Sequence, residues 1–242
     1  MSSVAKQRLP GRYPGLGRDV SAEADARVQR STGRRRRQQI LDAAIELFSS
    51  RGYRGTGMAA LSERVGITAP ALLYYFGSRE RLLTEVVAEA DRLRETLMAE
   101  MVAEHGQVDT QFSARYVRFG DLRRTGYHNV QTATLTRLYA VLTAENLDPA
   151  EPLHGFFVER YRSNRRFVRS LLRKDRREGL LRDDVDIDQV AAEVSSTALG
   201  AEIQWLLDPE SFDLGVFFER YIDRLGGDLA PPGKESGSGR KE

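Results

Sequence analysis

The sequence predicts an all-α protein in which a small N-terminal head precedes a larger helical body. Apolar residues recur at intervals of three and four along most of the chain, which is the period of an amphipathic helix. No segment alternates apolar and polar residues as a half-buried strand does, and no internal repeat is present. Glycines, prolines and capping residues separate the helical segments from one another.

The composition bounds the class of protein. The 242 residues, 40% of them apolar, suffice for a buried core in one large or two ordinary domains. The chain has no cysteine, which excludes disulfides, thiolate zinc sites and cysteine nucleophiles and suits a reducing compartment. It has no apolar run of about 18 residues and no apolar stretch behind its N-terminal charges, so we expect a soluble, unexported, cytoplasmic protein without membrane contact.

Charge is divided unevenly along the chain. Residues 1–55 carry twelve basic and five acidic side chains, whereas the whole chain has a net charge of only +2. This division indicates a basic surface for a polyanion at the N-terminal end. Residues 1–33 mix Gly, Pro, Ser, Arg and Ala without periodicity and predict a disordered basic arm, and residues 226–242 predict a disordered tail.

The head is expected to open with two helices. The first runs from about Arg34 to Arg51 and ends at Gly52, and the second is a two-turn helix that ends at Gly66. The apolar stripe of the first consists of Ile40, Ala44, Leu47 and Phe48. The stripe of the second consists of Met58, Leu61 and Val65. Each stripe fits one face of a helix that packs against a core.

Two further helices follow. Thr68 can cap a short third helix, whose first turn tolerates Pro70, and Leu72 and Phe76 should face inward. Ser78 can cap a fourth helix of about 27 residues, on the order of 40 Å long, which suffices to join two domains. Its apolar stripe consists of Leu82, Leu83, Val86, Ala90, Leu93 and Leu97.

The second and third helices, with the glycine-containing turn between them, form a helix-turn-helix. The order R-R-Q-Q-I-L-D-A-A-I-E-L-F, then G-Y-R-G-T-G-M-A-A-L-S-E-R-V-G-I-T-A-P-A-L-L-Y-Y-F-G-S-R-E-R-L-L, resembles the TetR (tetracycline-repressor) family of transcriptional regulators. The resemblance implies nine helices, with a DNA-binding head at residues 34–87. It also implies a helical body at residues 88–225 that holds a ligand cavity and pairs with a second subunit through its last two helices.

The third helix would read the major groove, because side chains on its outward face can reach base edges and phosphates. The outward residues are Thr68, Ala69, Pro70, Ala71, Leu73, Tyr74 and Tyr75. The small alanines allow contact with thymine methyls, and the tyrosine hydroxyls suit phosphates or base edges, unless both rings pack in the head core. We expect Arg79 to contact a phosphate, and Thr56 and Gly57 to do so at the start of the second helix, through the Thr56 hydroxyl and the helix N-terminus.

The resemblance supports these positions with some departures. Tyr75 stands where the family commonly has His or Tyr, and Arg79 where it usually has Lys. Leu73 replaces the usual tyrosine, and Gly57 and Ala59 stand where a hydroxyl and a polar or basic residue are common. Because fewer polar base contacts remain, readout through DNA shape and apolar contacts is expected, and no operator sequence follows.

Four consecutive arginines begin the first helix: Arg34, Arg35, Arg36 and Arg37. We expect them to contact phosphates or to reach a minor groove. The alternative is a solvated helix start, where like charges oppose the helix dipole. Whether the more distant arginines of the arm add contacts to double-stranded DNA stays open.

In the body, helical patterns cover residues near 112–119, 130–142 and 149–172, followed by two last helices. The first of these two starts at Asp186 and stops at Asp208 and Pro209, and the second ends near Leu225. Small residues that permit close helix approach are Ser195, Ser196, Ala198, Gly200 and Ala201. They favour a homodimer reading a near-palindrome, although intramolecular packing would explain them too.

An apolar pocket with a few polar anchors would use aromatic and amphipathic residues of the body. The candidate ligand contacts are Tyr127, His128, Tyr139, Phe157, Tyr161 and Trp205. Most should be core, and His128 should lie at a helix entry or on the surface. One helix face also carries Arg162, Arg166, Arg169, Arg173 and Arg176, which fits a solvated face or, alternatively, an acidic ligand or partner.

Catalysis has little support. The three histidines are far apart, and neither a phosphate-binding loop nor a nucleophile elbow is present, so we expect no enzyme, cofactor or metal. The sequence therefore predicts a dimeric regulator that binds DNA, acts most often in its family as a repressor, and is released by a small-molecule effector. The alternatives are a regulator whose body docks a protein partner, and a helical enzyme whose head is only structural.

Overall fold

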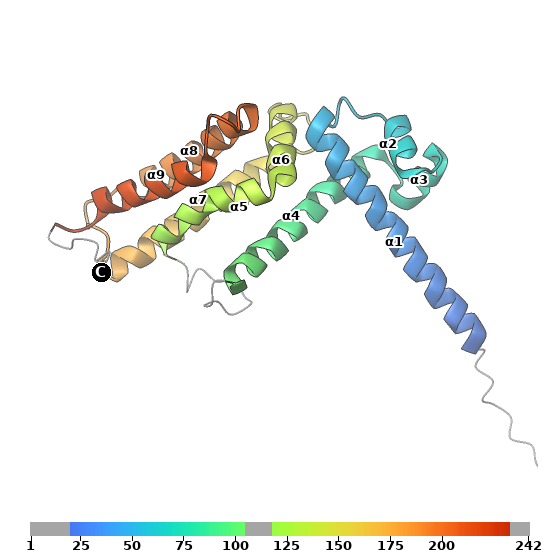
Figure 1. Ribbon diagram of the computed structural model, residues 1–242, viewed down its shortest axis with the longest axis horizontal. Coiled ribbons are helices and arrows are strands. Elements are labelled where there is room, and N and C mark those ends of the chain that lie inside the picture. Colours follow the sequence, from blue (N-terminus) through green and yellow to red (C-terminus); the bar gives the residue numbers. More distant parts are fainter. Residues whose placement is uncertain (1–19, 105–117, 233–242) are drawn as a thin grey trace, which may run out of the picture. The chain divides into compact units, whose positions relative to one another are not determined.

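The structure is a computed structural model that describes residues 20–104 and 118–232. Within these ranges the chain forms nine α-helices, one short 3-10 helix and no strand (Figure 1). The all-α prediction is therefore confirmed. The chain divides into two compact units, one up to Gln38 and one from Gln39 onward. None of the described helices is both long and apolar enough to cross a membrane.

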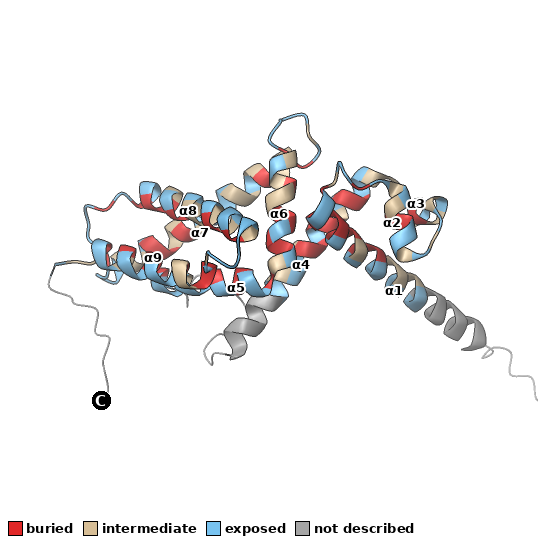
Figure 2. Ribbon diagram, turned by 45° about the horizontal axis from the view of Figure 1, so that its top comes forward, coloured by how far each residue is buried: buried red, intermediate tan, exposed pale blue. Residues whose placement is uncertain are grey.

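Three helices and the start of a fourth build the head. They are α1 at Val20–Arg51, α2 at Met58–Val65, α3 at Ala69–Phe76 and α4 at Arg79–Glu104. Their apolar stripes meet in one core (Figure 2), whose fully buried side chains include Ile40, Leu41, Phe48, Leu61, Leu72, Leu82 and Leu83. Gly52 and Gly66 take the left-handed conformation, with φ of 74° and 71°, so α1 and α2 end where the sequence predicted.

Both ends of the helical chain differ from the prediction. Helix α1 begins at Val20, so residues 20–33 of the predicted disordered arm are helical. This segment lacks an apolar stripe, but its Ala, Glu and Arg residues favour a helix through backbone propensity, and Gly33 costs only about 1 kcal/mol. At the other end the last helix continues through Gly226 to Leu229, beyond the predicted start of the tail. Residues 1–19 and 233–242 lie outside the described residues.

Five further helices form the body. They are α5 at Thr125–Gln131, α6 at Ala133–Glu145, α7 at His154–Arg177, α8 at Ile187–Leu207 and α9 at Leu214–Leu229. The buried side chains of α6 join the first core, whereas α7, α8 and α9 supply a second core. Helix α7 packs on α8, and α5 packs on α9 (Figure 1). Asp186 caps α8 by accepting from the backbone of Gln189 at 3.1 Å, and α8 stops at Asp208, as predicted.

The first part of the body, residues 119–145, consists of shorter helices than the sequence predicted. Of the helix predicted near residues 112–119, residues 112–117 lie outside the described residues. Phe119 instead begins a 3-10 helix, η1 at Phe119–Arg124. The helix predicted at 130–142 is two helices, because the chain turns between α5 and α6 at Thr132, where φ is −104° and ψ is 35°.

Two glycines let α5 lie directly against the start of α9. A Cβ atom at Gly126 would clash with the carbonyl oxygen of Leu214, and one at Gly215 would clash with the Tyr127 ring. Because such overlaps involve backbone and a packed ring, larger residues cannot be accommodated without moving a helix. This contact fixes α5, which carries the polar residues His128 and Asn129.

Candidate DNA interface and interior polar cluster

Helix α3 presents one face to the core and the opposite face to solvent. The Thr68 hydroxyl accepts from the backbone N–H of Ala71 at 3.3 Å, which is the predicted N-cap. Leu72 and Phe76 are buried. On the outer side Tyr74 is 87% exposed and Leu73 is 41% exposed. The outward face therefore carries two large side chains that are mostly or partly exposed and that lie outside the core of the described residues.

The other predicted contacts on α3 are distributed around its rim. Thr68 and Pro70 are exposed, whereas Ala69, Ala71 and Tyr75 are half-buried. Tyr75 packs against the head core, and its ring meets that of Tyr74 edge-on at 5.8 Å. Tyr75 thus combines core packing with partial exposure, and Tyr74 is the freer of the two tyrosines.

Thr56 and Arg79 brace the head from within. The buried Thr56 hydroxyl donates to the carbonyl oxygens of Gly52 at 2.8 Å and Leu47 at 3.4 Å. The Arg79 guanidinium lies 4.1 Å from the centre of the Tyr53 ring and donates to the carbonyl oxygens of Tyr53 and Thr56. In the structure both side chains hold the loop between α1 and α2, and their contact with phosphates stays a prediction.

The remaining predicted DNA contacts lie at helix starts. Gly57 is the exposed N-cap of α2 and has extended backbone, with φ of −77° and ψ of 161°. On α1, Arg34 and Arg35 are exposed, whereas Arg36 and Arg37 are half-buried. These arginines belong to the unit that ends at Gln38, so their contact with DNA stays a prediction.

The Glu145 carboxylate of the body accepts hydrogen bonds from the loop between α1 and α2. Glu145, in the last turn of α6, accepts from the backbone N–H groups of Tyr53 at 2.8 Å and Arg54 at 3.1 Å. The Arg54 side chain in turn pairs with Glu151. Since Arg79 holds the same loop from α4, both α4 and α6 are fastened to the head. Sequence reasoning missed Glu145, because 92 residues separate it from Tyr53 and no local pattern marks it.

The body interior contains a group of charged and polar side chains, which we call the Arg94 cluster. It consists of Asp91 and Arg94 of α4, His128 and Asn129 of α5, Tyr139 of α6, Arg160 of α7 and Glu202 of α8. Arg160 pairs with Asp91 at 2.6 Å and lies 3.6 Å from the centre of the Tyr139 ring. The Tyr139 hydroxyl donates to Asp91 at 2.6 Å, and burial raises the pKa of Tyr139, so the phenol stays protonated.

His128 lies deeper than the sequence predicted. The expectation of a helix entry or surface position is wrong, because the side chain is 1% exposed. Burial, with a smaller contribution from the Arg94 charge, lowers the pKa of His128 to about 4. The imidazole is therefore neutral near pH 7, and its Nε2 atom is buried without a hydrogen-bond partner among the described residues.

Only part of the predicted ligand set converges. His128 and Tyr139 belong to the Arg94 cluster, and Phe157 and Tyr161 stack with ring centres 6.5 Å apart on α7. Two others lie elsewhere: Trp205 packs in the second core, and the half-exposed Tyr127 donates to Glu219 at 2.9 Å on α9. Within the described residues, no group of three or more His, Cys, Asp or Glu side chains could hold a metal ion.

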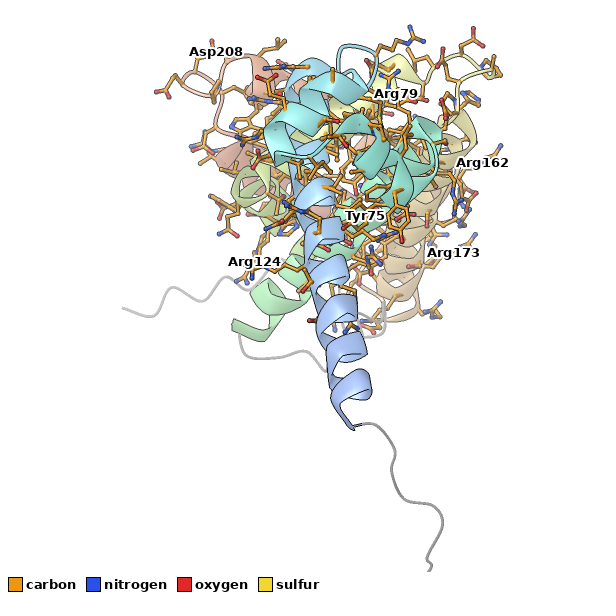
Figure 3. The ribbon with its side chains drawn as sticks, turned by 90° about the vertical axis from the view of Figure 1, so that its right-hand side faces the viewer. Tyr75, Arg79, Arg124, Arg162, Arg173 and Asp208 are labelled. Carbon is orange, nitrogen blue, oxygen red and sulfur yellow. The ribbon has the colours of Figure 1, made fainter. Side chains whose placement is uncertain are left out.

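The arginine face of α7 is partly neutralised. Arg166 pairs with Glu159, Arg169 pairs with Asp188, and Arg176 donates to the Val185 carbonyl. Arg162 and Arg173 are exposed along one side of the helix (Figure 3). This arrangement fits the solvated face that the sequence allowed.

Comparison with known proteins agrees with this geometry. The family described as "Bacterial regulatory proteins, tetR family" matches residues 40–86. The HTH-type transcriptional repressor AcnR of Corynebacterium jeikeium is 28% identical over 160 residues, which cover 64% of this chain and 74% of AcnR. A TetR-family regulator from Agrobacterium tumefaciens shares the fold with a TM-score of 0.65 and 17% identity, covering 82% of this chain and 100% of that one. The SmeT–triclosan complex does so with a TM-score of 0.64 and 18% identity, covering 86% and 97%.

The capped α2–turn–α3 unit, with its exposed outer face, defines a helix-turn-helix DNA-binding protein. Among helix-turn-helix DNA-binding proteins, the matched family and the similarity to AcnR indicate a bacterial transcriptional regulator. Residues 40–86 match the tetR family of bacterial regulatory proteins, and the chain is similar to a transcriptional repressor. Regulators of this family are transcription factors and not enzymes; they bind DNA as dimers and respond to small molecules.

Proposed function

We propose that this protein is a dimeric repressor that binds a near-palindromic operator through α3 and leaves it when an effector binds in the body. The observation that carries the proposal is the outer face of α3, where Tyr74 is 87% exposed beside the half-exposed Leu73. Burying such a face against DNA provides apolar contacts to thymine methyls and a hydroxyl for a phosphate or base edge. No packing requirement within the chain accounts for that face.

The dimer is supported by an unpartnered stripe on α8. Its exposed positions recur at helical spacing and are Ser196, Gly200, Ile203 and Leu207. Leu207 is 81% exposed, and a Cβ atom at Gly200 would meet nothing within 4 Å. A second copy would cover this stripe and gain apolar burial through close helix approach at Gly200. Two-fold symmetry then sets two copies of α3 on successive major grooves.

Some of the small residues of α8 do not belong to this exposed stripe. Ala201 is 2% exposed and packs inward, and the Ser195 hydroxyl donates to the Ala191 carbonyl at 2.8 Å. The intramolecular packing that the sequence left open therefore accounts for some of them, and Ser196 and Gly200 are left for a partner.

Effector release requires that the body communicate with the head. Helix α4 carries Arg79 at its head end and Arg94 in the body, and Glu145 ties α6 to the loop between α1 and α2. An effector that favours a different position of α4 or α6 would change the spacing of the two heads and lower operator affinity. SmeT, which shares the fold, forms a complex with triclosan, and this supports a small molecule as the effector.

The first test is selection of bound fragments from sheared host DNA by the purified protein, at fixed near-physiological salt. The wild type should enrich a near-palindrome. Tyr74→Ala should lose the enrichment, and Tyr74→Phe, which keeps the ring, should separate the role of the hydroxyl from that of the ring. Uniform weak binding with a steep salt dependence would show only a basic surface and would contradict the proposal.

A further inference from the structure

Arg94 is a guanidinium in the body interior that forms no ion pair with any of the described residues, although the charges of Glu202 and Asp91 act on it. The side chain is half-buried, and among the described residues it makes no hydrogen bond or ion pair; its nearest described ring is Tyr139, with the centre 6.0 Å away. Burial is the main cause that lowers the pKa of Arg94, and the Arg160 charge lowers it further, whereas the nearby Glu202, Tyr139 and Asp91 raise it. Partly buried donors without hydrogen-bond partners are unfavourable, so a ligand that supplies acceptors to Arg94 would be stabilised there.

The two carboxylates whose charges act on Arg94 accept their hydrogen bonds from other side chains. Asp91 accepts from Arg160 and from the Tyr139 hydroxyl, each at 2.6 Å. Glu202 accepts from the Asn129 amide at 2.6 Å, and no ion pair joins it to Arg94 within the described residues. The N–H groups of Arg94 therefore have no hydrogen-bond acceptor among the described residues, because these acceptors bind Arg160, Tyr139 and Asn129.

His128 supplies a second unused polar group beside Arg94. Its Nε2 atom is buried and unpartnered among the described residues, and the ring is close enough to Arg94 for that charge to influence it. A neutral imidazole with its proton on Nε2 donates a hydrogen bond. Arg94 from α4 and His128 from α5 are thus neighbouring groups whose donors have no hydrogen-bond partner among the described residues, and Arg94 is partly exposed.

We propose that Arg94 and His128 form an anion site in the body and that its occupant is the carboxylate group of the effector. A planar carboxylate matches the fork of a guanidinium, which can bind it through two parallel hydrogen bonds. An ammonium ligand fits less well, because Asp91 and Glu202 already have partners. The identity of the ligand class rests on the proposed function, whereas the anion site itself does not.

The binding test uses the full chain and matched probes in isothermal titration calorimetry. The probes are acetate, benzoate, octanoate and decanedioate, with benzamide and octanamide as neutral counterparts and inorganic phosphate as a non-planar anion. We expect at least one carboxylate to bind, its amide not to, and Arg94→Gln to weaken binding about tenfold or more, as for loss of a charged hydrogen bond. Arg162→Gln, an exposed arginine of α7, is the matched control and should bind as the wild type. Absence of any Arg94-dependent carboxylate binding, or stronger binding of phosphate, overturns the proposal.

A second measurement needs no ligand. If Arg94 is kept for binding, Arg94→Met should leave the melting temperature of the ligand-free protein unchanged or raise it, because it removes an unmatched buried charge. If Arg94 instead completes the fold, the same change should lower the melting temperature by several degrees, and the proposal fails.

Measuring operator affinity with and without a carboxylate distinguishes failure of the anion site from failure of the proposed function. With the wild type, a bound carboxylate that lowers operator affinity supports both. A carboxylate that binds through Arg94 without changing operator affinity supports the anion site and contradicts effector release. Operator binding without Arg94-dependent carboxylate binding leaves the DNA-binding function intact and overturns the anion site.

Discussion

Acid should destabilise this protein through a single buried side chain, His128. Its pKa is about 4 in the folded chain, against 6.5 for an unperturbed histidine. Because the folded pKa is the lower one, the unfolded chain binds more protons between these values. The stabilisation is complete above about pH 6.5 and is lost as the pH falls toward 4.

The size of the effect follows from the two pKa values. A difference of about 2.5 units corresponds to about 3 kcal/mol in total, of which about 2 kcal/mol is lost by pH 5. The side chain is 1% exposed, so solvent does not screen the effect. Arg94 is the one charge that contributes to the shift beside burial, and it acts in the same direction.

The assay is urea unfolding of the wild type and of His128→Gln at pH 8, 6.5 and 5, at one protein concentration because dimers gain apparent stability with concentration. Glu202 and Asp175 have raised pKa values and so oppose the trend, but they are common to both proteins. The wild type should lose about 2 kcal/mol more than the variant between pH 8 and pH 5. Parallel pH dependences in the two proteins would refute the buried, neutral state of His128.

Three further substitutions test separate parts of the structure. Glu145→Gln keeps one of the two oxygen acceptors and should lower the free energy of unfolding by about 1 kcal/mol. It should also weaken operator binding in a DNA titration. Unchanged operator affinity would mean that the contact between Glu145 and the loop does not position the head. Gly200→Arg should give monomers in sedimentation without lowering the monomer's stability, because its Cβ points into open space; persisting dimers would place the interface elsewhere. Gly126→Ala should cost about 2 kcal/mol, since its Cβ meets the Leu214 carbonyl; a neutral effect would show that α5 and α9 can separate.

Local patterns predicted the head well because its determinants are local. The Thr68 cap and the left-handed Gly66 act within one turn of the residues that they constrain, and the inward pair Leu72 and Phe76 follows from helical spacing. Residues fixed by tertiary contacts were not predictable in this way. The contact of Arg79 with the Tyr53 carbonyl, for example, joins residues that are 26 positions apart, and no local pattern marks it.

The same limit applies to the body, with a functional consequence. Composition marked His128 and Tyr139 as possible ligand contacts but could not show that Asp91 and Arg160 are used up by each other and by Tyr139. Only the set of pairs among the described residues shows that Arg94 forms no ion pair or hydrogen bond with them. A search for ligand sites in such proteins therefore depends on which charges remain after pairing, since the types of residue present do not distinguish a structural pair from a binding group.

The position of Arg94 on α4 also bounds how strongly an anion could act on DNA binding. Arg79 and Arg94 are 15 residues apart on one helix, which is about 22 Å at 1.5 Å per residue. Moving a two-state equilibrium from 1:99 to 99:1 needs about 5.5 kcal/mol of differential affinity. The tenfold weakening expected for Arg94→Gln corresponds to about 1.4 kcal/mol, so a carboxylate that reaches Arg94 in only one position of α4 supplies about a quarter of that difference. Since Arg79 and Glu145 hold the same loop, a shift of α4 against α6 would strain it, and the head would change position as a unit.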